Sequence, residues 1–153
     1  MANTYTQLLV QFVFAVKGRQ SLIREQFREE VEKYICAVVK SNKSRVLAIY
    51  CNPDHCHVLV GLHPSVSISN MAREMKSSSS KWLNTKRLFK GRFSWQRGFG
   101  AFTYSKSQMP AVVNYILNQP KHHQKISFQK EYTEFLEKFG IEYDEKYTFH
   151  AID

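Results

Sequence analysis

Two histidines that could share a metal ion stand one residue apart in the stretch NPDHCHVLVGL, as His55 and His57. On a β-strand, residues i and i+2 point to the same face, so both imidazoles would project together and Cys56 would face the other way. Two imidazoles make a partial site for a divalent metal, but they do not complete one. Structural histidines held by hydrogen bonds are the alternative that this stretch leaves open.

A possible nucleophile and a possible oxygen ligand occur together further along the chain. In YILNQ, Tyr115 and Gln119 are four residues apart, so a helix would present both on one side. A tyrosine can act as a covalent nucleophile, and a glutamine carbonyl is a hard oxygen ligand. Combined with His55 and His57, this ligand set contains no thiolate and suits Mg²⁺ or Mn²⁺ on a phosphate. A core tyrosine and a polar helix end are the alternatives.

A basic segment rich in aromatic residues indicates the class of substrate. The chain has a net charge of +9 from 22 basic and 13 acidic residues, which favours a polyanionic partner. Basic residues gather between positions 73 and 97 with aromatic residues among them, a composition typical of a surface for single-stranded nucleic acid. A solvated basic face above ordinary core aromatics is the alternative. The expected nucleic-acid contacts are Arg73, Lys76, Lys81, Arg92, Trp95 and Arg97.

The elements that must position these residues follow a regular order. Alternation and turn residues predict strands over residues 4–16, 45–52, 55–62 and 99–105. Apolar periodicity predicts helices over residues 21–42, 65–86 and 107–119, and a C-terminal amphipathic helix that Gly140 ends. The expected N-caps are Ser21, then Ser65 or Ser67, then Ser107. The run Ser77–Ser80 is poor helix-forming sequence, and its hydroxyls could approach a sugar-phosphate backbone.

This order predicts an α+β fold. Strand, helix, two strands, helix and strand form the split βαβ, or ferredoxin-like, arrangement, with helices packed on an antiparallel sheet. The tyrosine-bearing helix and the C-terminal helix follow it. In such a fold the tyrosine-bearing helix can cross the sheet face that carries the two histidines. The sequence thus predicts one site built from distant segments.

The length and composition predict the general character of the protein. The 153 residues suit a single domain over residues 1–153. No run reaches the roughly 20 apolar residues of a membrane span, and the N-terminus lacks the pattern of a signal peptide. We therefore expect a cytoplasmic protein with no membrane partner. The three cysteines form no C-x-x-C motif, so we expect small buried side chains rather than disulfides or a zinc knuckle.

Together these segments resemble the single-tyrosine transposases of the HUH superfamily, which move insertion sequences as single-stranded DNA. The resemblance spans essentially the whole chain and rests on NPDHCHVLVGL, KSSSSKWLN, FSWQRGFGAFTYSKS and VVNYILNQPKHHQ. It implies that His55, His57 and Gln119 bind the metal and that Tyr115 is the catalytic nucleophile, which forms a 5′-phosphotyrosine link. It also implies a homodimer, in which the histidines of one subunit can work with the tyrosine helix of the other. The implied substrate is single-stranded DNA with hairpin ends.

Two positions depart from the pattern of that superfamily. Cys56 stands where a bulky aliphatic residue is usual, and we expect little effect because it should face away from the metal. Pro120 directly follows Gln119. Proline disfavours helical geometry at the preceding residue, so we expect the tyrosine helix to end or kink at Gln119 and to displace its carbonyl.

Three polar residues near these motifs have two interpretations each. His122 and His123 follow the tyrosine helix, and we expect exposed loop histidines, with contact to a metal or phosphate as the alternative. Asp54 precedes the histidine pair and either orients a histidine or caps the turn.

Two other functions remain open at this point. A non-catalytic module that binds single-stranded nucleic acid would account for the basic segment, but not for the co-occurrence of His55, His57 and Tyr115. A domesticated relative of a transposase, acting on chromosomal repeats, would keep the same residues.

Overall fold

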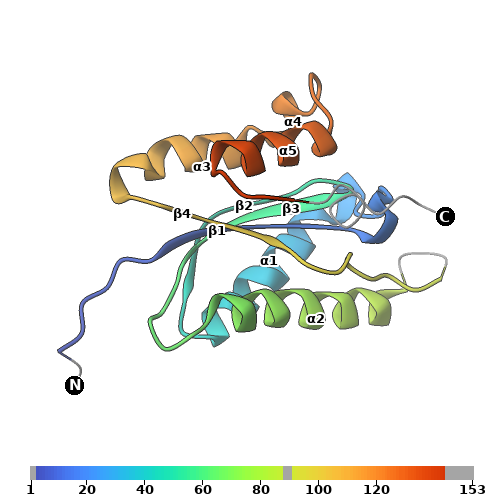
Figure 1. Cartoon of the computed structure of the whole chain (residues 1–153). Helices are drawn as coiled ribbons and strands as arrows, with labels where there is room; N and C mark the ends of the chain where they lie inside the picture. The colour runs from blue at the N-terminus through green and yellow to red at the C-terminus, as the bar shows by residue number, and fades with distance from the viewer. Residues whose placement is uncertain (1–2, 88–90, 144–153) are drawn as a thin grey trace.

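The computed structural model describes residues 3–87 and 91–143, which form a four-stranded antiparallel sheet between two layers of helices (Figure 1). The spatial order of the strands is β2-β3-β1-β4, and each neighbouring pair is antiparallel. This is the predicted ferredoxin-like arrangement. The strands are β1 (Leu9–Ala15), β2 (Arg45–Cys51), β3 (His55–Gly61) and β4 (Gly100–Tyr104).

The helices divide between the two faces of the sheet. In Figure 1, α1 and α2 cover one face, and α3, α4 and α5 cover the other. None of the helices within the described ranges is long and apolar enough to cross a membrane. Their bounds are α1 (Glu25–Ser41), α2 (Ile68–Lys86), α3 (Met109–Leu117), α4 (Gln119–His122) and α5 (Phe128–Lys138), with short 3-10 turns at Lys17–Arg19 and Lys106–Gln108.

Strand β3 is buried on both faces, and its successive side chains point alternately to the two layers of helices. Cys56, Val58 and Val60 belong to the core beneath α1 and α2. Leu59 packs under α3 on the opposite face, together with Ile116. The register places the histidines on that second face, since successive side chains alternate along a strand. The prediction that Cys56 faces away from the histidines is therefore confirmed.

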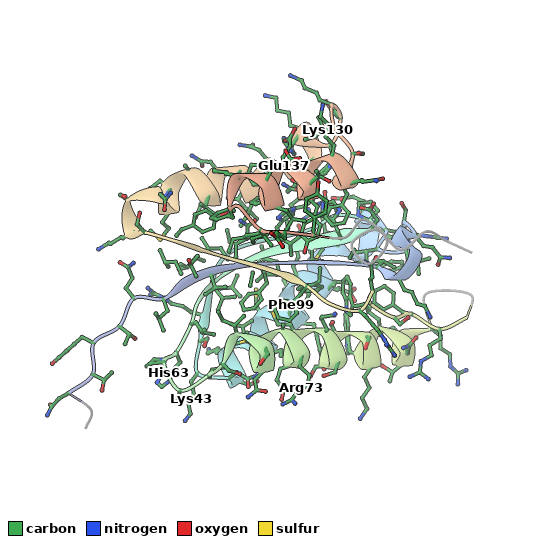
Figure 2. The ribbon with its side chains drawn as sticks, viewed as in Figure 1. Lys43, His63, Arg73, Phe99, Lys130 and Glu137 are labelled. Carbon is green, nitrogen blue, oxygen red and sulfur yellow. The ribbon has the colours of Figure 1, made fainter. Side chains whose placement is uncertain are left out.

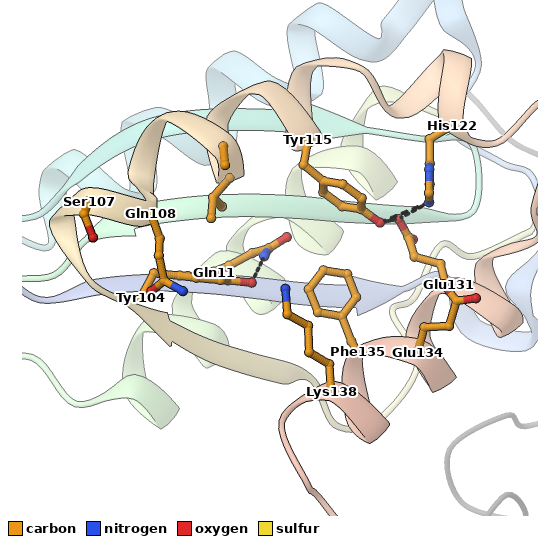
Figure 3. A pocket seen from close by; sticks show the side chains of 12 residues that line it. Gln11, Tyr104, Ser107, Gln108, Tyr115, His122, Glu131, Glu134, Phe135 and Lys138 are labelled. Atoms are coloured by element: carbon orange, nitrogen blue, oxygen red, sulfur yellow. Dashed lines mark hydrogen bonds and ion pairs between the residues drawn. The ribbon is translucent and has the colours of Figure 1, made fainter.

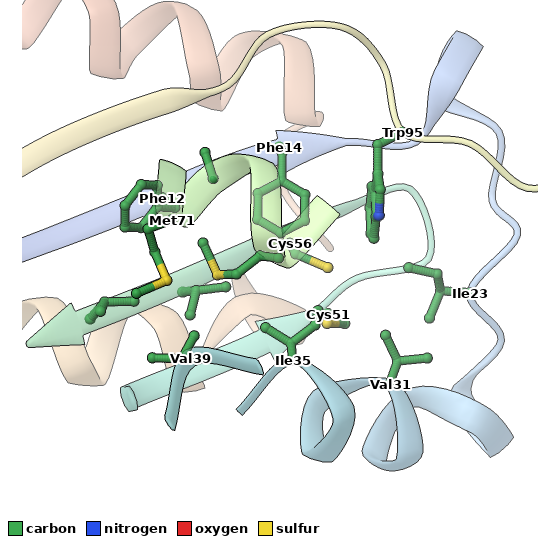
Figure 4. Packing of buried hydrophobic residues seen from close by; sticks show 14 of the residues in the cluster. Phe12, Phe14, Ile23, Val31, Ile35, Val39, Cys51, Cys56, Met71 and Trp95 are labelled. Carbon is green, nitrogen blue, oxygen red and sulfur yellow. The ribbon is translucent and has the colours of Figure 1, made fainter. Parts of the chain in front are cut away.

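The larger core lies between the sheet and the layer of α1 and α2 (Figure 4). Helix α1 contributes Val31, Ile35 and Val39, which are four residues apart and share one face of the helix. Strand β1 contributes Phe14, whose ring meets the ring of Trp95 edge-on, with 4.7 Å between centroids. This core fixes β1 and β3 against α1 and α2, and so provides a rigid base for the opposite face.

One of the four consecutive serines belongs to this core. Ser79 is fully buried, and its hydroxyl donates to the carbonyl of Met75 while it accepts a hydrogen bond of 2.9 Å from Trp95 Nε1. The Ser79 hydroxyl thus satisfies a buried indole N–H, which accounts for a serine within an otherwise apolar helix face. Ser77 is exposed, and its hydroxyl donates to the carbonyl of Arg73.

Helix α2 begins as predicted, but α1 does not. The Ser67 hydroxyl accepts a hydrogen bond from the backbone N–H of Asn70 and caps α2. Helix α1 begins only at Glu25, so the prediction of Ser21 as its N-cap is wrong. The reason is that the chain before α1 is tied to the β2–β3 turn: Ile23 is buried, and its N–H donates to the carbonyl of Pro53.

The tyrosine-bearing segment is divided into shorter elements instead of the single predicted helix. Ser105, rather than Ser107, forms a capping box with Gln108 and starts a 3-10 turn before α3. The α3 helix ends at Asn118, whose backbone (φ −97°, ψ 17°) leaves the helical region, and α4 starts at the next residue. The predicted break thus occurs one residue earlier, since Pro120 lies in the first turn of α4, where its missing N–H costs nothing.

The contact between Ser79 and Trp95 predicts different effects for neighbouring serines. Ser79→Ala should lower the free energy of unfolding by about 1–3 kcal/mol, because it leaves the buried indole N–H of Trp95 without this acceptor. Ser77→Ala is the matched control and should change stability by less than about 0.5 kcal/mol. Urea denaturation followed by circular dichroism measures both values. Equal effects of the two substitutions would contradict the role of Ser79 in the core.

Candidate active site

His55 and His57 lie side by side and buried at the start of β3, with 5.2 Å between ring centroids. Each ring is held at Nδ1 by an oxygen: Asp54 Oδ1 lies 2.7 Å from His55, and Gln11 Oε1 lies 2.8 Å from His57. Asp54 therefore orients a histidine, which was one of its two interpretations. Both Nε2 atoms are left to face the layer of α3, α4 and α5.

The buried surroundings change the proton affinity of these groups. Burial would raise the pKa of the Asp54 carboxyl, but hydrogen bonding and attraction to His55 outweigh it and hold that pKa below its usual value. Burial lowers the pKa of His57 despite a nearby carboxylate. The site therefore combines an anionic Asp54 with a deeply buried imidazole.

The carboxylate of Glu131, on α5, lies at the centre of the site. This side chain is 2% exposed, and its Oε1 lies 3.0 Å from His57 Nε2 and 3.3 Å from His55 Nε2. The same oxygen lies 3.1 Å from His123 Nε2. Burial would raise the pKa of Glu131, but hydrogen bonds with His123, His55 and His57 hold it well below the usual range. Glu131 is thus an anion surrounded by three imidazoles.

The second oxygen of this carboxylate reaches the tyrosine helix. Glu131 Oε2 accepts a hydrogen bond from the Tyr115 hydroxyl, and His122 Nε2 lies 3.2 Å from that hydroxyl (Figure 3). The rings of Tyr115 and His57 meet edge-on, with 5.8 Å between centroids. Burial, followed by the charge of Glu131, raises the pKa of Tyr115 far above its usual value. The structure therefore brings Tyr115 and the two histidines together within one chain.

Gln119 is fully buried in the same cluster and presents its amide nitrogen rather than its carbonyl. Its Nε2 donates to Glu131 Oε2 over 3.0 Å, and its Oε1 accepts from Asn52 Nδ2 over 2.9 Å. Turning the amide round would set its oxygen against the carboxylate, so this network fixes its orientation. Gln119 lies beside the histidines, and its role as a metal ligand stays a prediction.

His122 and His123 take part in the site, so the expectation of exposed loop histidines is wrong. The side chains are 31% and 17% exposed. His123 Nδ1 donates to the carbonyl of Ile126, and its Nε2 faces Glu131. The reason is that the chain continues helically through α4 after the break at Asn118, which turns both rings towards the sheet.

Four of these residues could hold a metal ion. The ligand atoms of His55, His57, His123 and Glu131 all lie within 4.8 Å of one another. Reasoning from the sequence missed Glu131, although one signal was present. It lies in the apolar stripe of α5, three residues after Phe128, and a carboxylate on the buried face of an amphipathic helix requires a partner.

A pocket of about 530 Å³ opens beside the tyrosine (Figure 3). It lies between α3 and α5, and Tyr115 and Glu131 form part of its wall. The floor includes Gln11 and Tyr104, which hydrogen-bond to each other over 2.8 Å. The Tyr115 hydroxyl is therefore next to a space large enough for part of a substrate.

The predicted nucleic-acid residues separate into two groups. Lys76 donates to the carbonyls of Gln96 and Gly98, and burial lowers its pKa. Trp95 is buried, so both residues help to build the loop after α2. The other four are exposed, and Figure 2 labels Arg73 on the outer side of α2. They are Arg73, Lys81, Arg92 and Arg97.

Two adjoining hollows lie between α2 and the segment that follows it, and both include Ser77 and Ser80. Arg73 lines one of them, and Lys81 and Arg92 line the other. We call this surface the α2 groove. Residues 88–90, which belong to the same basic segment, lie outside the described residues. Helix α2 covers one face of the sheet, whereas His55 and His57 face the layer of α3, α4 and α5 on the other.

Comparison with known proteins agrees with this geometry. Residues 4–119 match the family of IS200-like transposases. The transposases of insertion sequence element IS200 from Salmonella typhimurium and Salmonella typhi are each 27% identical over 124 residues, which cover 78% of this chain and 81% of theirs.

Two solved structures share the fold. A putative transposase from Deinococcus radiodurans superimposes with a TM-score of 0.62 at 19% identity, over 78% of this chain and 95% of that one. A REP-associated tyrosine transposase bound to a REP hairpin gives a TM-score of 0.61 at 18% identity, over 82% of this chain and 74% of that one. With its histidine pair, its tyrosine helix and a family match over most of its length, the chain belongs to the IS200-like transposases.

Proposed function

We propose that this transposase cleaves and rejoins single-stranded DNA through Tyr115, with Mg²⁺ or Mn²⁺ bound at His55 and His57. One observation carries the proposal: within a single chain, the Tyr115 hydroxyl and the two histidine Nε2 atoms all meet the carboxylate of Glu131. A nucleophile and metal-binding nitrogens at such close range are what phosphoryl transfer to a tyrosine requires.

The proposed reaction exchanges one phosphodiester for another. The Tyr115 oxygen forms a bond to the phosphorus, and the bond between that phosphorus and the 3′ oxygen breaks. The phenol gives up its proton and the departing 3′ oxygen takes one up, so the step is balanced. The product is a 5′-phosphotyrosine and a free 3′-hydroxyl, and attack by a 3′-hydroxyl on the phosphotyrosine reverses the step without ATP.

The residues around the histidines fit a divalent cation. Both rings are held at Nδ1, so that Nε2 can bind a metal. The bound cation would withdraw charge from the phosphate oxygens and make the phosphorus easier to attack. Gln119 is the third ligand that the family resemblance implies. Its carbonyl would have to leave Asn52 to act in that way.

We further propose that the DNA carries hairpin ends and binds along the α2 groove. The exposed cations Arg73, Lys81 and Arg92 line this groove and support the proposal, because phosphate contacts supply most of the sequence-independent affinity for nucleic acid. Arg97 is exposed but lies outside the groove, and its contact with DNA stays a prediction. A related fold occurs in the REP-associated transposase bound to a REP hairpin. A homodimer, which light scattering can measure, is also part of the proposal.

Loss of the Tyr115 hydroxyl should abolish covalent cleavage. With Mn²⁺ and a labelled single strand that bears a hairpin, the wild-type protein should form an adduct that survives denaturing electrophoresis. Tyr115→Phe should form none while binding the strand within about 3-fold of wild type, because only the attacking oxygen is removed. Tyr5→Phe, at a tyrosine that is 92% exposed, is the matched control and should form the adduct normally.

The same assay separates the competing functions. An adduct that persists in Tyr115→Phe would refute this residue as the nucleophile. A wild-type protein that binds the strand but never cleaves it, with or without metal, would instead identify a binding module. Cleavage of chromosomal repeats, but not of hairpins beside its own gene, would identify a domesticated relative.

Removal of two cations from the α2 groove should weaken DNA binding in a salt-dependent way. Arg73→Ala combined with Lys81→Ala should reduce the magnitude of the slope of log affinity against log salt by about 1–2. Each phosphate contact that is lost means that fewer counterions are released when the DNA binds. Lys33→Ala with Lys40→Ala, on α1, removes the same charge from exposed positions elsewhere and is the control. Fluorescence anisotropy at several salt concentrations measures the slopes. Equal slopes for the two double variants would place the DNA on another surface.

A further inference from the structure

Three imidazoles in the site are oriented in the same way. The Nδ1 partners are the carboxylate of Asp54, the side-chain oxygen of Gln11 and the backbone carbonyl of Ile126, for His55, His57 and His123 respectively. The Gln11 amide nitrogen donates to Tyr104, which directs its oxygen to His57. All three partners accept hydrogen bonds, so each Nδ1 carries a hydrogen, and a ring in its neutral form presents a lone pair at Nε2.

The three Nε2 atoms converge on one carboxylate oxygen of Glu131. The Nε2 atoms of His55, His57 and His123 lie 3.3, 3.0 and 3.1 Å from the same oxygen, Glu131 Oε1. Neutral imidazole nitrogens and a carboxylate oxygen are all acceptors, so their convergence requires a proton or a metal cation among them. Convergence of four donors whose opposite ends are fixed by hydrogen bonds is typical of a metal centre.

We propose that Glu131 and His123 are ligands of the catalytic metal, together with His55 and His57. The inference rests on the proposed function, which needs the metal at the histidine pair, and it assigns the remaining protein ligands. Gln119 then acts as a positioning residue: its amide nitrogen donates to Glu131 Oε2 and leaves Oε1 facing the imidazoles. The chain thus uses a carboxylate from α5 where a glutamine carbonyl was expected.

The element that carries Glu131 lies outside the region that matches the transposase family. That match ends at residue 119, whereas His123 follows α4 and Glu131 belongs to α5. Strand β4 and helix α5 pack closely at Gly100. A Cβ atom at Gly100 of β4 would lie 2.7 Å from the hydroxyl oxygen of Tyr132, so a larger residue there would displace the Tyr132 ring. Helix α5 is therefore a fitted part of the site.

The donor set also indicates the preferred ion. Three imidazole nitrogens and one carboxylate oxygen suit a transition-metal dication better than Mg²⁺, which favours oxygen ligands and retains its water. We expect Mn²⁺ to bind more tightly than Mg²⁺. Titration calorimetry on the full chain without DNA measures both affinities and does not depend on activity. Tighter binding of Mg²⁺ would contradict the nitrogen-rich ligand set.

Substitution on α5 tests the carboxylate directly. Glu131→Gln should weaken Mn²⁺ binding by at least about 10-fold, which is the smallest effect usual for groups that support a metal site. Glu137→Gln makes the same change at an exposed position of the same helix and should bind Mn²⁺ like the wild type (Figure 2). Unchanged or tighter binding by Glu131→Gln would overturn the proposal. The Glu131 carboxylate would then occupy the space between the histidines without acting as a metal ligand.

A second pair of variants guards against a folding defect in the first. His123 is partly exposed, so His123→Ala should fold, as circular dichroism can verify, and should also weaken Mn²⁺ binding by about 10-fold. His63→Ala, with its ring at the other end of β3, should leave binding unchanged (Figure 2). Wild-type affinity in folded His123→Ala would remove this residue from the ligand set.

His57→Ala distinguishes failure of this inference from failure of the proposed function. If His57→Ala loses Mn²⁺ binding while Glu131→Gln and His123→Ala keep it, the histidine pair holds the metal and only the further ligands are refuted. If His57→Ala also binds Mn²⁺ normally, the metal lies elsewhere and the proposed function loses its cofactor site.

Discussion

The arrangement of the layer formed by α3, α4 and α5 depends on a single buried anion. The Glu131 carboxylate contacts side chains from β3, from α3 and from the α4 segment, so three separate stretches of chain are brought together around it. A buried carboxylate is costly unless it is paired and hydrogen-bonded, and here both oxygens have several partners. The same contacts that offset this cost also bring Tyr115 to the histidines. The contacts that stabilise this layer are therefore also the contacts that assemble the site.

The sequence predicted the fold and the histidine pair well, because both follow from local periodicity. Alternation along β3 was enough to separate His55 and His57 from Cys56, and the order of elements was enough to place a helix over them. The central carboxylate could not be found in that way. Glu131 is 74 residues from His57 in the chain, and no local pattern encodes their contact. Its position in an apolar stripe was the only trace of it.

Errors at the element ends have separate causes. Ser21 has the right chemistry for a cap, but a contact of Ile23 with the β2–β3 turn delays the start of α1. Ser107 is replaced as a cap by Ser105, which forms a capping box with Gln108. Likewise, His122 and His123 resemble loop residues in the sequence, because Pro120 suggests that the helix stops. In the structure Pro120 lies in the first turn of the short helix α4, and this helix brings both histidines close to the sheet. Local propensity predicted the kinds of element, whereas tertiary contacts and local caps determined the residues at which each element begins and ends.

The burial of β3 on both faces has a consequence for how the protein can fail. Its pairing with β1 sets His57 opposite Val13 and Cys56 opposite Phe14. A slip by one residue would exchange the two faces of β3. It would place the imidazoles in the core beneath α1 and α2 and turn the Cys56 thiol towards α3 and α5. Such a misfolded chain could keep its sheet and its helices but would lack the cluster of His55, His57 and Glu131. The pairing register of β3 therefore determines whether the site can form.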